Sequence, residues 1–185
     1  ISVMLKNGAY MINSEQADRL AEIVLVDKTD KKGNVRKIVN RECVGRDAKV
    51  ILAKIGVNVS DDIRCIICET DFNHPFVQQE LMMPILPIVR VDNIDEAIDL
   101  AVKAEHGNRH TAHMHSKNID NLSRFARAVE TTIFVKNAPS YAGIGFGGEG
   151  HTTFTIAGPT GEGITSARSF TRQRRCVTAD SFRII

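Results

Sequence analysis

The chain has 185 residues, of which 43% are hydrophobic and 25% charged, so it has the length and composition of one globular domain and not of a disordered or fibrous chain. Its 24 Lys and Arg against 22 Asp and Glu give a net charge of +2, which excludes binding to nucleic acid through bulk charge. The apolar runs are too short to span a membrane and the four cysteines too sparse for a disulfide framework, so a reducing cytoplasm is expected.

The first half of the chain predicts three helices and one strand. The helices are expected at residues 1–5, 15–26 and 47–55, and the strand at residues 64–69. Because residues 1–5 are typical of the interior of an apolar helix, the chain is expected to be a fragment of a longer protein. The charged stretch 27–37 predicts an exposed turn around Gly33.

The second half predicts strands and helices in alternation. Apolar residues recur at three- and four-residue spacings over 92–105 and 118–130, which predicts two amphipathic helices. Strands are expected at residues 85–91, 111–116, 132–136, 152–156 and 176–184. Short connections in β-α-β-α-β order favour a doubly wound, mostly parallel α/β sheet with helices on both faces. Ligands are then expected at the carboxyl ends of the strands.

Three glycines satisfy a pattern that is typical of dinucleotide-binding turns. Gly143, Gly145 and Gly148 form G-x-G-x-x-G. That pattern belongs between a strand and a helix, whereas residues 152–155, which follow it, favour a strand. We therefore expect a loop that is mobile or closely packed and lines a site, and not a cradle for pyrophosphate.

Two pairs of side chains could in principle bind a metal. Cys65 and Cys68 form C-x-x-C, but side chains three apart in a strand point to opposite faces and no second pair accompanies them, which favours buried, inert thiols. His113 and His115 share a strand face, but no third ligand is evident. No metal site is predicted.

Three further features have alternative interpretations. Histidine is well matched to proton transfer near neutral pH, so His110 is either a catalytic base or a structural histidine where a strand opens. Glu80 is either a surface acid or a buried acceptor for paired sugar hydroxyls just before a core strand. Residues 168–183 hold five arginines and one acid, which suits phosphates, a neighbouring subunit or a solvated edge strand.

Five segments together resemble the CoA-acylating aldehyde dehydrogenases, in particular the propionaldehyde and acetaldehyde enzymes of diol and ethanolamine utilisation. They are R-E-C-V-G-R-D-A at residues 41–48, E-L-M-M-P-I-L at 80–86, E-H-G-N-R-H-T-A-H at 105–113, residues 134–150 and residues 161–176. The resemblance implies the aldehyde dehydrogenase fold. Residues 1–168 match part of its catalytic domain, and residues 169–185 match an oligomerisation strand.

The resemblance also implies an activity. In this family a cysteine thiolate attacks the aldehyde, hydride passes to NAD, and coenzyme A takes the acyl group from the enzyme thioester. By resemblance that cysteine precedes Ile1, so these residues alone are expected to be inactive. The expected partners are a short-chain aldehyde, coenzyme A and further copies of the protein, with neither nucleic acid nor a membrane. The expected location is the cytoplasm, or a bacterial microcompartment within it.

Residue by residue, the resemblance implies roles for several side chains. Glu80 matches the glutamate that accepts hydrogen bonds from the nicotinamide ribose, with Met82 near the ring and Pro84 closing the motif. His110 matches the base that helps to deprotonate the thiol of coenzyme A. The candidates for lining the aldehyde channel are Asn137, Ser140 and Ile156.

Two alternatives remain open at this stage. One is an enzyme that works in the reducing direction, or the aldehyde-forming half of a bifunctional aldehyde/alcohol dehydrogenase. The other is a non-catalytic assembly module that joins partners through the basic C-terminal stretch at residues 168–183. CoA-dependent NADH formation by the full-length parent would separate the enzyme from this module, and loss of activity on Glu80→Ala would support the ribose role of Glu80.

Overall fold

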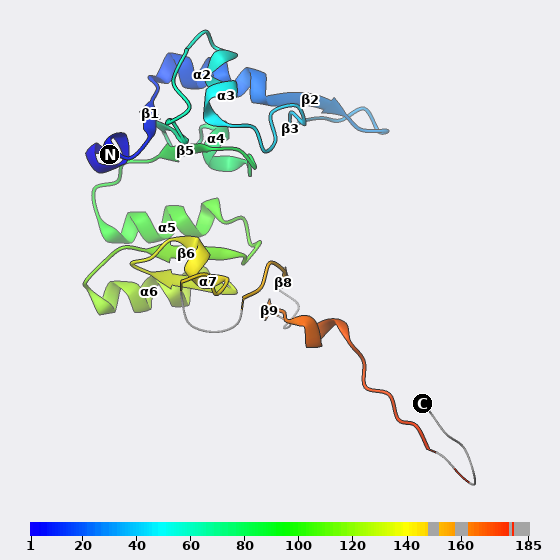
Figure 1. Cartoon of the computed structure of the whole chain (residues 1–185). Coiled ribbons are helices and arrows are strands. Elements are labelled where there is room, and N and C mark those ends of the chain that lie inside the picture. Colours follow the sequence, from blue (N-terminus) through cyan, green and yellow to red (C-terminus); the bar gives the residue numbers. More distant parts are fainter. Residues whose placement is uncertain (148–151, 158–162, 178, 180–185) are drawn as a thin grey trace. The chain divides into compact units, whose positions relative to one another are not determined.

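The computed structural model describes residues 1–147, 152–157, 163–177 and 179. Its internal contacts divide the chain into two units, Ile1–Asn93 and Ile94–Ile185, each of which is described by itself (Figure 1). Among the described residues, none of the helices combines the length and the apolar character that crossing a membrane requires.

The first unit contains a three-stranded sheet with parallel neighbours, in the order β1-β4-β5. Its helices are α1 (Ser2–Lys6), α2 (Ser14–Val24), α3 (Ala48–Ala53) and α4 (Pro75–Gln78). Its strands are β1 (Ala9–Met11), β2 (Leu25–Thr29), β3 (Val35–Val39), β4 (Cys65–Glu69) and β5 (Ile85–Ile88). The three predicted helices and the strand at 64–69 are confirmed, with ends displaced by one or two residues.

The stretch 27–37, predicted as a turn, is mostly an antiparallel ribbon, so that prediction was wrong. β2 and β3 pair from Leu25 opposite Val39 to Thr29 opposite Val35, and they extend beyond α2 (Figure 1). Only residues 30–34 turn, around Gly33 with a φ of +85°. Residues 26–37 are all exposed, so the ribbon carries no alternation of buried and polar side chains from which its strands could be recognised.

The core of the first unit lies between α2, α3 and β4. The inner face of α2 repeats at three- and four-residue spacings, as predicted for an amphipathic helix. A capping box starts this helix: the side chain of Asn13 accepts from the Gln16 backbone N–H at 2.8 Å, and the Asn13 N–H donates to Gln16 Oε1 at 3.0 Å. The largest fully buried side chains are Ile12, Leu20, Leu25, Ile51, Leu52, Ile66 and Ile67.

The second unit contains a pair of parallel strands, with Thr111 opposite Ile133 and Met114 opposite Lys136. Its helices are α5 (Ile94–Ala104), α6 (Ile119–Val129) and α7 (Ser140–Gly143), with a 3-10 helix at Ala167–Phe170. Its strands are β6 (Thr111–Met114), β7 (Ile133–Lys136), β8 (Ile156–Ala157) and β9 (Gly163–Ile164). The predicted helices and the parallel pairing are confirmed. The strand predicted at 85–91 pairs with β4 in the first unit.

Helices cover both faces of the β6–β7 pair. On one face, Phe134 meets Phe125 of α6 edge-on, with 5.5 Å between ring centroids, and packs in the same apolar cluster as Ile98 of α5. Ile133 and Val135 point to the other face, because side chains alternate along a strand, and α7 packs there. This arrangement agrees with the predicted sheet that has helices on both sides.

α7 packs closely against β7 at Gly143. A Cβ atom at this glycine would lie 2.2 Å from Ile133 Cγ2 and 3.0 Å from Val135 Cγ2. The prediction of a closely packed glycine is therefore confirmed here. Gly145 has a φ of +85°, and Gly148 lies outside the described residues.

Gly143→Ala is expected to destabilise the fold by about 1–3 kcal/mol, because its methyl group overpacks a filled space. Urea denaturation measures this loss in free energy of unfolding. Ile133→Ala removes the methyl group that would clash, so Gly143→Ala should lower the free energy of unfolding less in a protein that already carries Ile133→Ala. Strictly additive costs in the double variant would contradict this account of the packing.

The strand predicted at 152–156 was mostly wrong. In the described residues 152–157 and 163–177, the strands are Ile156–Ala157 and Gly163–Ile164, which pair in antiparallel fashion. Thr153 is buried, and its backbone N–H donates to the Ile144 carbonyl at 3.0 Å, so hydrogen bonding to the glycine-containing loop replaces strand pairing there. Within 176–184, the described residues 176, 177 and 179 have no regular structure and the others lie outside the description.

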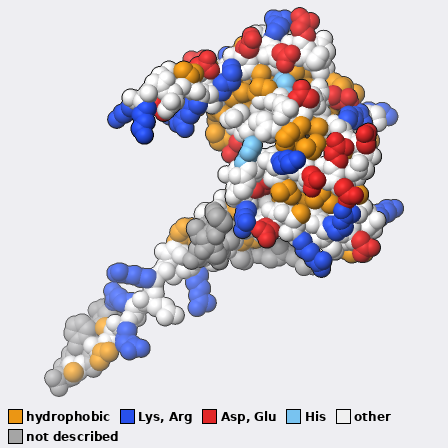
Figure 2. All heavy atoms as spheres, turned by 180° about the vertical axis from the view of Figure 1, so that it is seen from behind, with side chains coloured by type: hydrophobic (Ala, Val, Ile, Leu, Met, Phe, Trp, Pro, Cys, Tyr) orange, Lys and Arg blue, Asp and Glu red, His pale blue; other side chains and the backbone are white. Residues whose placement is uncertain are grey.

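The basic stretch near the end of the chain is exposed. Its described arginines are Arg168, Arg172, Arg174 and Arg175. Figure 2 shows their side chains spread along an extended segment, and none of them forms an ion pair within the described part of the chain. The interpretation as an edge strand is not supported, because residues 171–177 pair with no described strand.

Candidate functional site

Glu80 lies between α4 and β5, and backbone hydrogen bonds fix the residues that follow it. The carbonyl of Met82 accepts from the Gly45 N–H at 3.1 Å, and the carbonyl of Pro84 accepts from the Ile66 N–H at 2.8 Å. Met82 has a φ of +53°, which a residue other than glycine rarely adopts, and its side chain is 59% exposed. This segment is therefore fixed by backbone hydrogen bonds and not by regular secondary structure.

The side chain of Glu80 is exposed, so the interpretation as a buried acceptor was wrong. Its carboxylate makes no hydrogen bond and no ion pair with any residue that the structure describes. Both oxygens are therefore available to accept hydrogen bonds from a ligand. A free carboxylate on a fixed backbone fits a sugar with two neighbouring hydroxyls.

His110 lies at the amino end of β6, as expected for a residue where the strand opens. Its backbone N–H donates to Glu105 Oε1 at 3.1 Å, and its Nδ1 lies 2.7 Å from Thr111 Oγ1. In the tautomer in which Nδ1 donates to that hydroxyl, Nε2 keeps a free lone pair. The side chain is exposed, so this lone pair can reach a molecule from outside.

The carboxyl ends of β6 and β7 are joined by Asn137. Its Oδ1 accepts from the Ser116 backbone N–H at 2.7 Å, and its Nδ2 donates to the Ser116 carbonyl at 2.9 Å. Asn137 has a φ of +52°, a conformation that asparagine tolerates better than most residues. Beside it, Ser140 Oγ lies 3.3 Å from His113 Nδ1. The amide of Asn137 thus binds the backbone of this chain.

The structure separates the predicted site residues of the second unit into two groups. Asn137 and Ser140 lie at the carboxyl end of the strand pair, where ligands are expected, and His110 lies at the amino end. The four residues of β6 place about 13 Å between the two ends. Ile156 lies in the β8–β9 ribbon, opposite Ile164. Glu80 belongs to the other unit.

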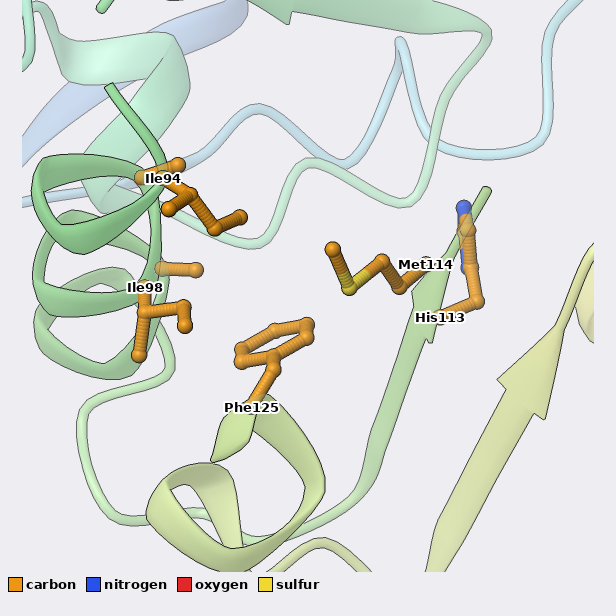
Figure 3. Close-up of a pocket in the computed structure, with 7 residues that line it drawn as sticks. Ile94, Ile98, His113, Met114 and Phe125 are labelled. Carbon is orange, nitrogen blue, oxygen red and sulfur yellow. The ribbon is translucent and has the colours of Figure 1, made fainter. Parts of the chain in front are cut away.

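An apolar cavity of about 230 Å³ lies between α5, α6 and β6. Its lining residues are Ile94, Ala97, Ile98, Ala101, His113, Met114 and Phe125. In Figure 3, Met114 points from the strand toward Phe125 and Ile98. Sequence analysis did not identify this cavity, because its residues have the helical spacing of an ordinary core.

The cysteines of β4 are poor nucleophiles. Burial, together with repulsion from the neighbouring Cys65, raises the pKa of Cys68 to about 11, and burial also raises the pKa of Cys65. Both thiols therefore stay protonated near neutral pH, and the thiolate is the reactive form. Cys43 is fully buried, whereas Cys176 is exposed. The prediction of a buried thiol is confirmed for Cys68, whereas Cys65 is only half-buried, and the raised pKa values of both thiols favour low reactivity near neutral pH.

Iodoacetamide at pH 7.5 is expected to label Cys176 more than about a hundredfold faster than Cys68, because of exposure and the raised pKa. Peptide mass spectrometry measures the two rates. The pKa of Cys68 is raised in the folded protein. Its protonated thiol therefore contributes to stability below about pH 9, and this contribution is lost as the pH rises through about 11. Equal labelling of the two cysteines in folded protein would contradict this environment for Cys68.

His113 and His115 do not lie together in a strand, because β6 ends at Met114. Their rings meet edge-on, with 5.7 Å between centroids. Across the described ranges, no group of three or more His, Cys, Asp and Glu side chains could hold a metal ion.

Comparison with known proteins places the chain in one family. Residues 64–174 match the model of the aldehyde dehydrogenase family. The acetylating acetaldehyde dehydrogenase EutE of Salmonella typhimurium is 54% identical over 177 residues, which are 96% of this chain and 37% of that protein. The chain therefore spans little more than a third of the length of this curated relative.

Two solved structures are also similar. One is a propionaldehyde dehydrogenase from the fucose utilisation microcompartment of Clostridium phytofermentans, with 53% identity and a TM-score of 0.81, covering 98% of this chain and 40% of that chain. The other is the propionaldehyde dehydrogenase of Rhodopseudomonas palustris with bound CoA and an acylated cysteine, with 52% identity and a TM-score of 0.80, covering 95% of this chain and 38% of that chain. Because the family model covers more than half of its residues, this chain belongs to the aldehyde dehydrogenase family.

Proposed function

We propose that this chain is part of a CoA-acylating aldehyde dehydrogenase, which oxidises a short-chain aldehyde with NAD and passes the acyl group from an enzyme thioester to coenzyme A. The observation that carries the proposal is the exposed, unpaired carboxylate of Glu80 on a fixed backbone. It is supported by relatives at about half identity that are named as acetylating or propionaldehyde dehydrogenases. The enzyme's further copies would form a homo-oligomer.

The nucleophilic cysteine of this enzyme lies outside the 185 residues. Three cysteines of this chain are unsuited to be the nucleophile, because Cys43 and Cys68 are buried and the pKa values of Cys65 and Cys68 are raised. Cys176 is exposed but belongs to an extended segment without regular structure, which cannot hold a thiolate in a fixed attacking position. The relative from Rhodopseudomonas palustris was solved with an acylated cysteine, which supports a thioester intermediate.

Three residues of the first unit would bind NAD, which supplies the hydride acceptor when it is bound. Glu80 would accept hydrogen bonds from two ribose hydroxyls, a bidentate contact that would orient the nicotinamide. Met82 would lie beside the ring, and its exposed side chain is available for that contact. Pro84 lies at a bend, in which the Ile85 N–H donates to the Met83 carbonyl at 2.8 Å, and its own carbonyl accepts from the Ile66 N–H.

His110 would act on the thiol of coenzyme A. Its free Nε2 takes the thiol proton, the resulting thiolate attacks the carbonyl carbon of the thioester, and the enzyme cysteine leaves as a thiolate. Ser140 and Ile156 would line the aldehyde channel, and Asn137 would shape it by holding Ser116. Small residues in the neighbouring glycine loop would leave room for the extended thiol arm.

The reaction direction in the cell depends on the supply of aldehyde and acyl-CoA, so the reductive direction belongs to the same proposal. A bifunctional aldehyde/alcohol dehydrogenase is less favoured, since such an enzyme from Clostridium acetobutylicum is only 29% identical. A location in the cytoplasm or in a bacterial microcompartment is supported by the relative from Clostridium phytofermentans.

The proposal is tested by assaying the full-length protein that carries these residues with propanal, NAD and coenzyme A. It predicts formation of NADH and propanoyl-CoA in equal amounts, with turnover that requires coenzyme A. Sustained NADH formation with release of propanoate in the absence of coenzyme A would overturn the acylating activity. A folded protein that forms no NADH would favour the assembly module.

A further inference from the structure

We infer that His74 is a positioning residue for Glu80, because it anchors the single helical turn that leads to this glutamate. The inference rests on the proposed function, in which Glu80 binds the ribose of NAD. His74 belongs to none of the predicted site residues. Three observations carry it: the cap that its ring provides, the burial of that ring, and the short path from α4 to Glu80.

The imidazole of His74 caps the amino end of α4. Its Nδ1 accepts from the backbone N–H of Phe76 at 3.1 Å, and its carbonyl accepts from the N–H of Val77 at 2.9 Å. A helix of four residues has almost no stability of its own, so an interaction that satisfies its first free N–H has a large influence. His74 takes the place that Asn, Ser or Asp usually occupies at a cap.

The ring is also held from its other side. The residue is only 9% exposed, and Nε2 lies 3.4 Å from Asp18 Oδ1 on α2. Because Nδ1 accepts a hydrogen bond, the ring proton is on Nε2. Nε2 makes no hydrogen bond to a described residue, so its interaction with Asp18 is electrostatic only. The ring of Phe76 meets the imidazole edge-on, with 4.8 Å between centroids.

Glu80 follows this anchored turn directly. The last bond of α4 runs from the Gln79 N–H to the Pro75 carbonyl at 3.0 Å, and Glu80 is the next residue. Phe76 on one side of Glu80 is 3% exposed and Leu81 on the other side is 6% exposed, and both belong to the same core cluster. Glu80 is thus an exposed carboxylate between two buried anchors.

A carboxylate that accepts from two hydroxyls of one sugar is sensitive to small displacements. The carboxyl-side anchor is secured by the backbone hydrogen bonds of Met82 and Pro84. The amino-side anchor depends on His74. Loss of the imidazole should therefore weaken NAD binding more than it weakens binding of coenzyme A, and a residue that can cap a helix should restore it.

The test uses the full-length protein with His74→Ala and His74→Asn. His74→Ala is expected to raise the KM for NAD about fivefold, the size of effect that loss of one cap gives, with the KM for coenzyme A unchanged. His74→Asn is expected to return the KM for NAD to its original value, because asparagine caps well. Hydrogen exchange of residues 76–80 should rise in His74→Ala and not in His74→Asn.

Asn13→Ala is the matched control, since it removes the cap of α2 in the same unit. It should lower Tm as His74→Ala does and leave the KM for NAD unchanged. If His74→Ala gives no folded protein, Asp18→Ala takes its place in the test, because the Asp18 side chain is 73% exposed. A KM for NAD raised about twofold in Asp18→Ala supports the inference, and an unchanged KM for NAD overturns it.

Failure of this inference is distinguishable from failure of the proposed function. If Glu80→Gln raises the KM for NAD and His74→Ala does not, the positioning role alone is overturned. If neither variant changes the KM for NAD, the ribose role of Glu80 fails and the positioning role fails with it. An equal rise in the KM for NAD in Asn13→Ala would also overturn the positioning role, because the effect would then be general loss of stability.

Discussion

His110→Gln in the full-length enzyme is expected to slow CoA-dependent turnover about 100-fold, the usual loss when a general base is removed. Glutamine keeps a polar side chain of similar reach but cannot take a proton from a thiol. Formation of the thioester does not need this base, so the first turnover should still release NADH as a rapid burst. Stopped-flow absorbance of NADH, with and without coenzyme A, measures both steps.

His113→Gln is the natural control for this prediction. His113 lies at the opposite end of the strand pair, beside Ser140, so its replacement can alter aldehyde binding but should leave the rate of acyl transfer to coenzyme A within about twofold. The reverse outcome, a slow His113→Gln and an unaffected His110→Gln, would place the base at the carboxyl end of β6. A lost burst in His110→Gln would show that this residue acts before acyl transfer.

Glu80→Gln is expected to lower kcat/KM for NAD by about 10- to 100-fold. A carboxylate accepts two charge-assisted hydrogen bonds, whereas the amide accepts at one atom only and presents a donor at the other. Initial rates at varied NAD concentration, with aldehyde and coenzyme A in excess, give kcat and the KM for NAD. The KM for coenzyme A should stay constant.

Glu15→Gln serves as the comparison, because Glu15 is an exposed acid in the first turn of α2 in the same unit. It removes the same charge and should leave kcat/KM for NAD unchanged. Equal losses in Glu15→Gln and Glu80→Gln would attribute the effect to net charge. Unaltered kinetics in Glu80→Gln would remove the residue from the NAD site.

The elements that sequence analysis predicted well are those with a buried face. α2, α5 and α6 repeat apolar residues at helical spacing, and α6 begins at Asn118, whose side chain accepts from two backbone N–H groups. The β2–β3 ribbon was missed because exposure at residues 26–37 leaves no period of burial in the sequence. The division of the predicted sheet between two units depends on contacts between distant segments, which no local pattern encodes.

The candidate site shows the same limit. The exposure of Glu80 could not be predicted, because the apolar run after it suits a buried carboxylate equally well. The bond between Asn137 and Ser116 joins residues 21 positions apart, and the sequence contains no spacing rule for such a contact. His74 escaped notice for a similar reason: histidine is an unusual helix cap, and only its ring geometry identifies it as one.

In the proposed mechanism, a cysteine outside these 185 residues forms the thioester that Glu80 and His110 serve. Mass spectrometry of the full-length protein, incubated with propanal and NAD in the absence of coenzyme A, tests it most directly. One propanoyl group should appear on a cysteine that is not Cys43, Cys65, Cys68 or Cys176, and it should disappear when coenzyme A is added. Acylation of one of these four cysteines, or of none, would contradict the account.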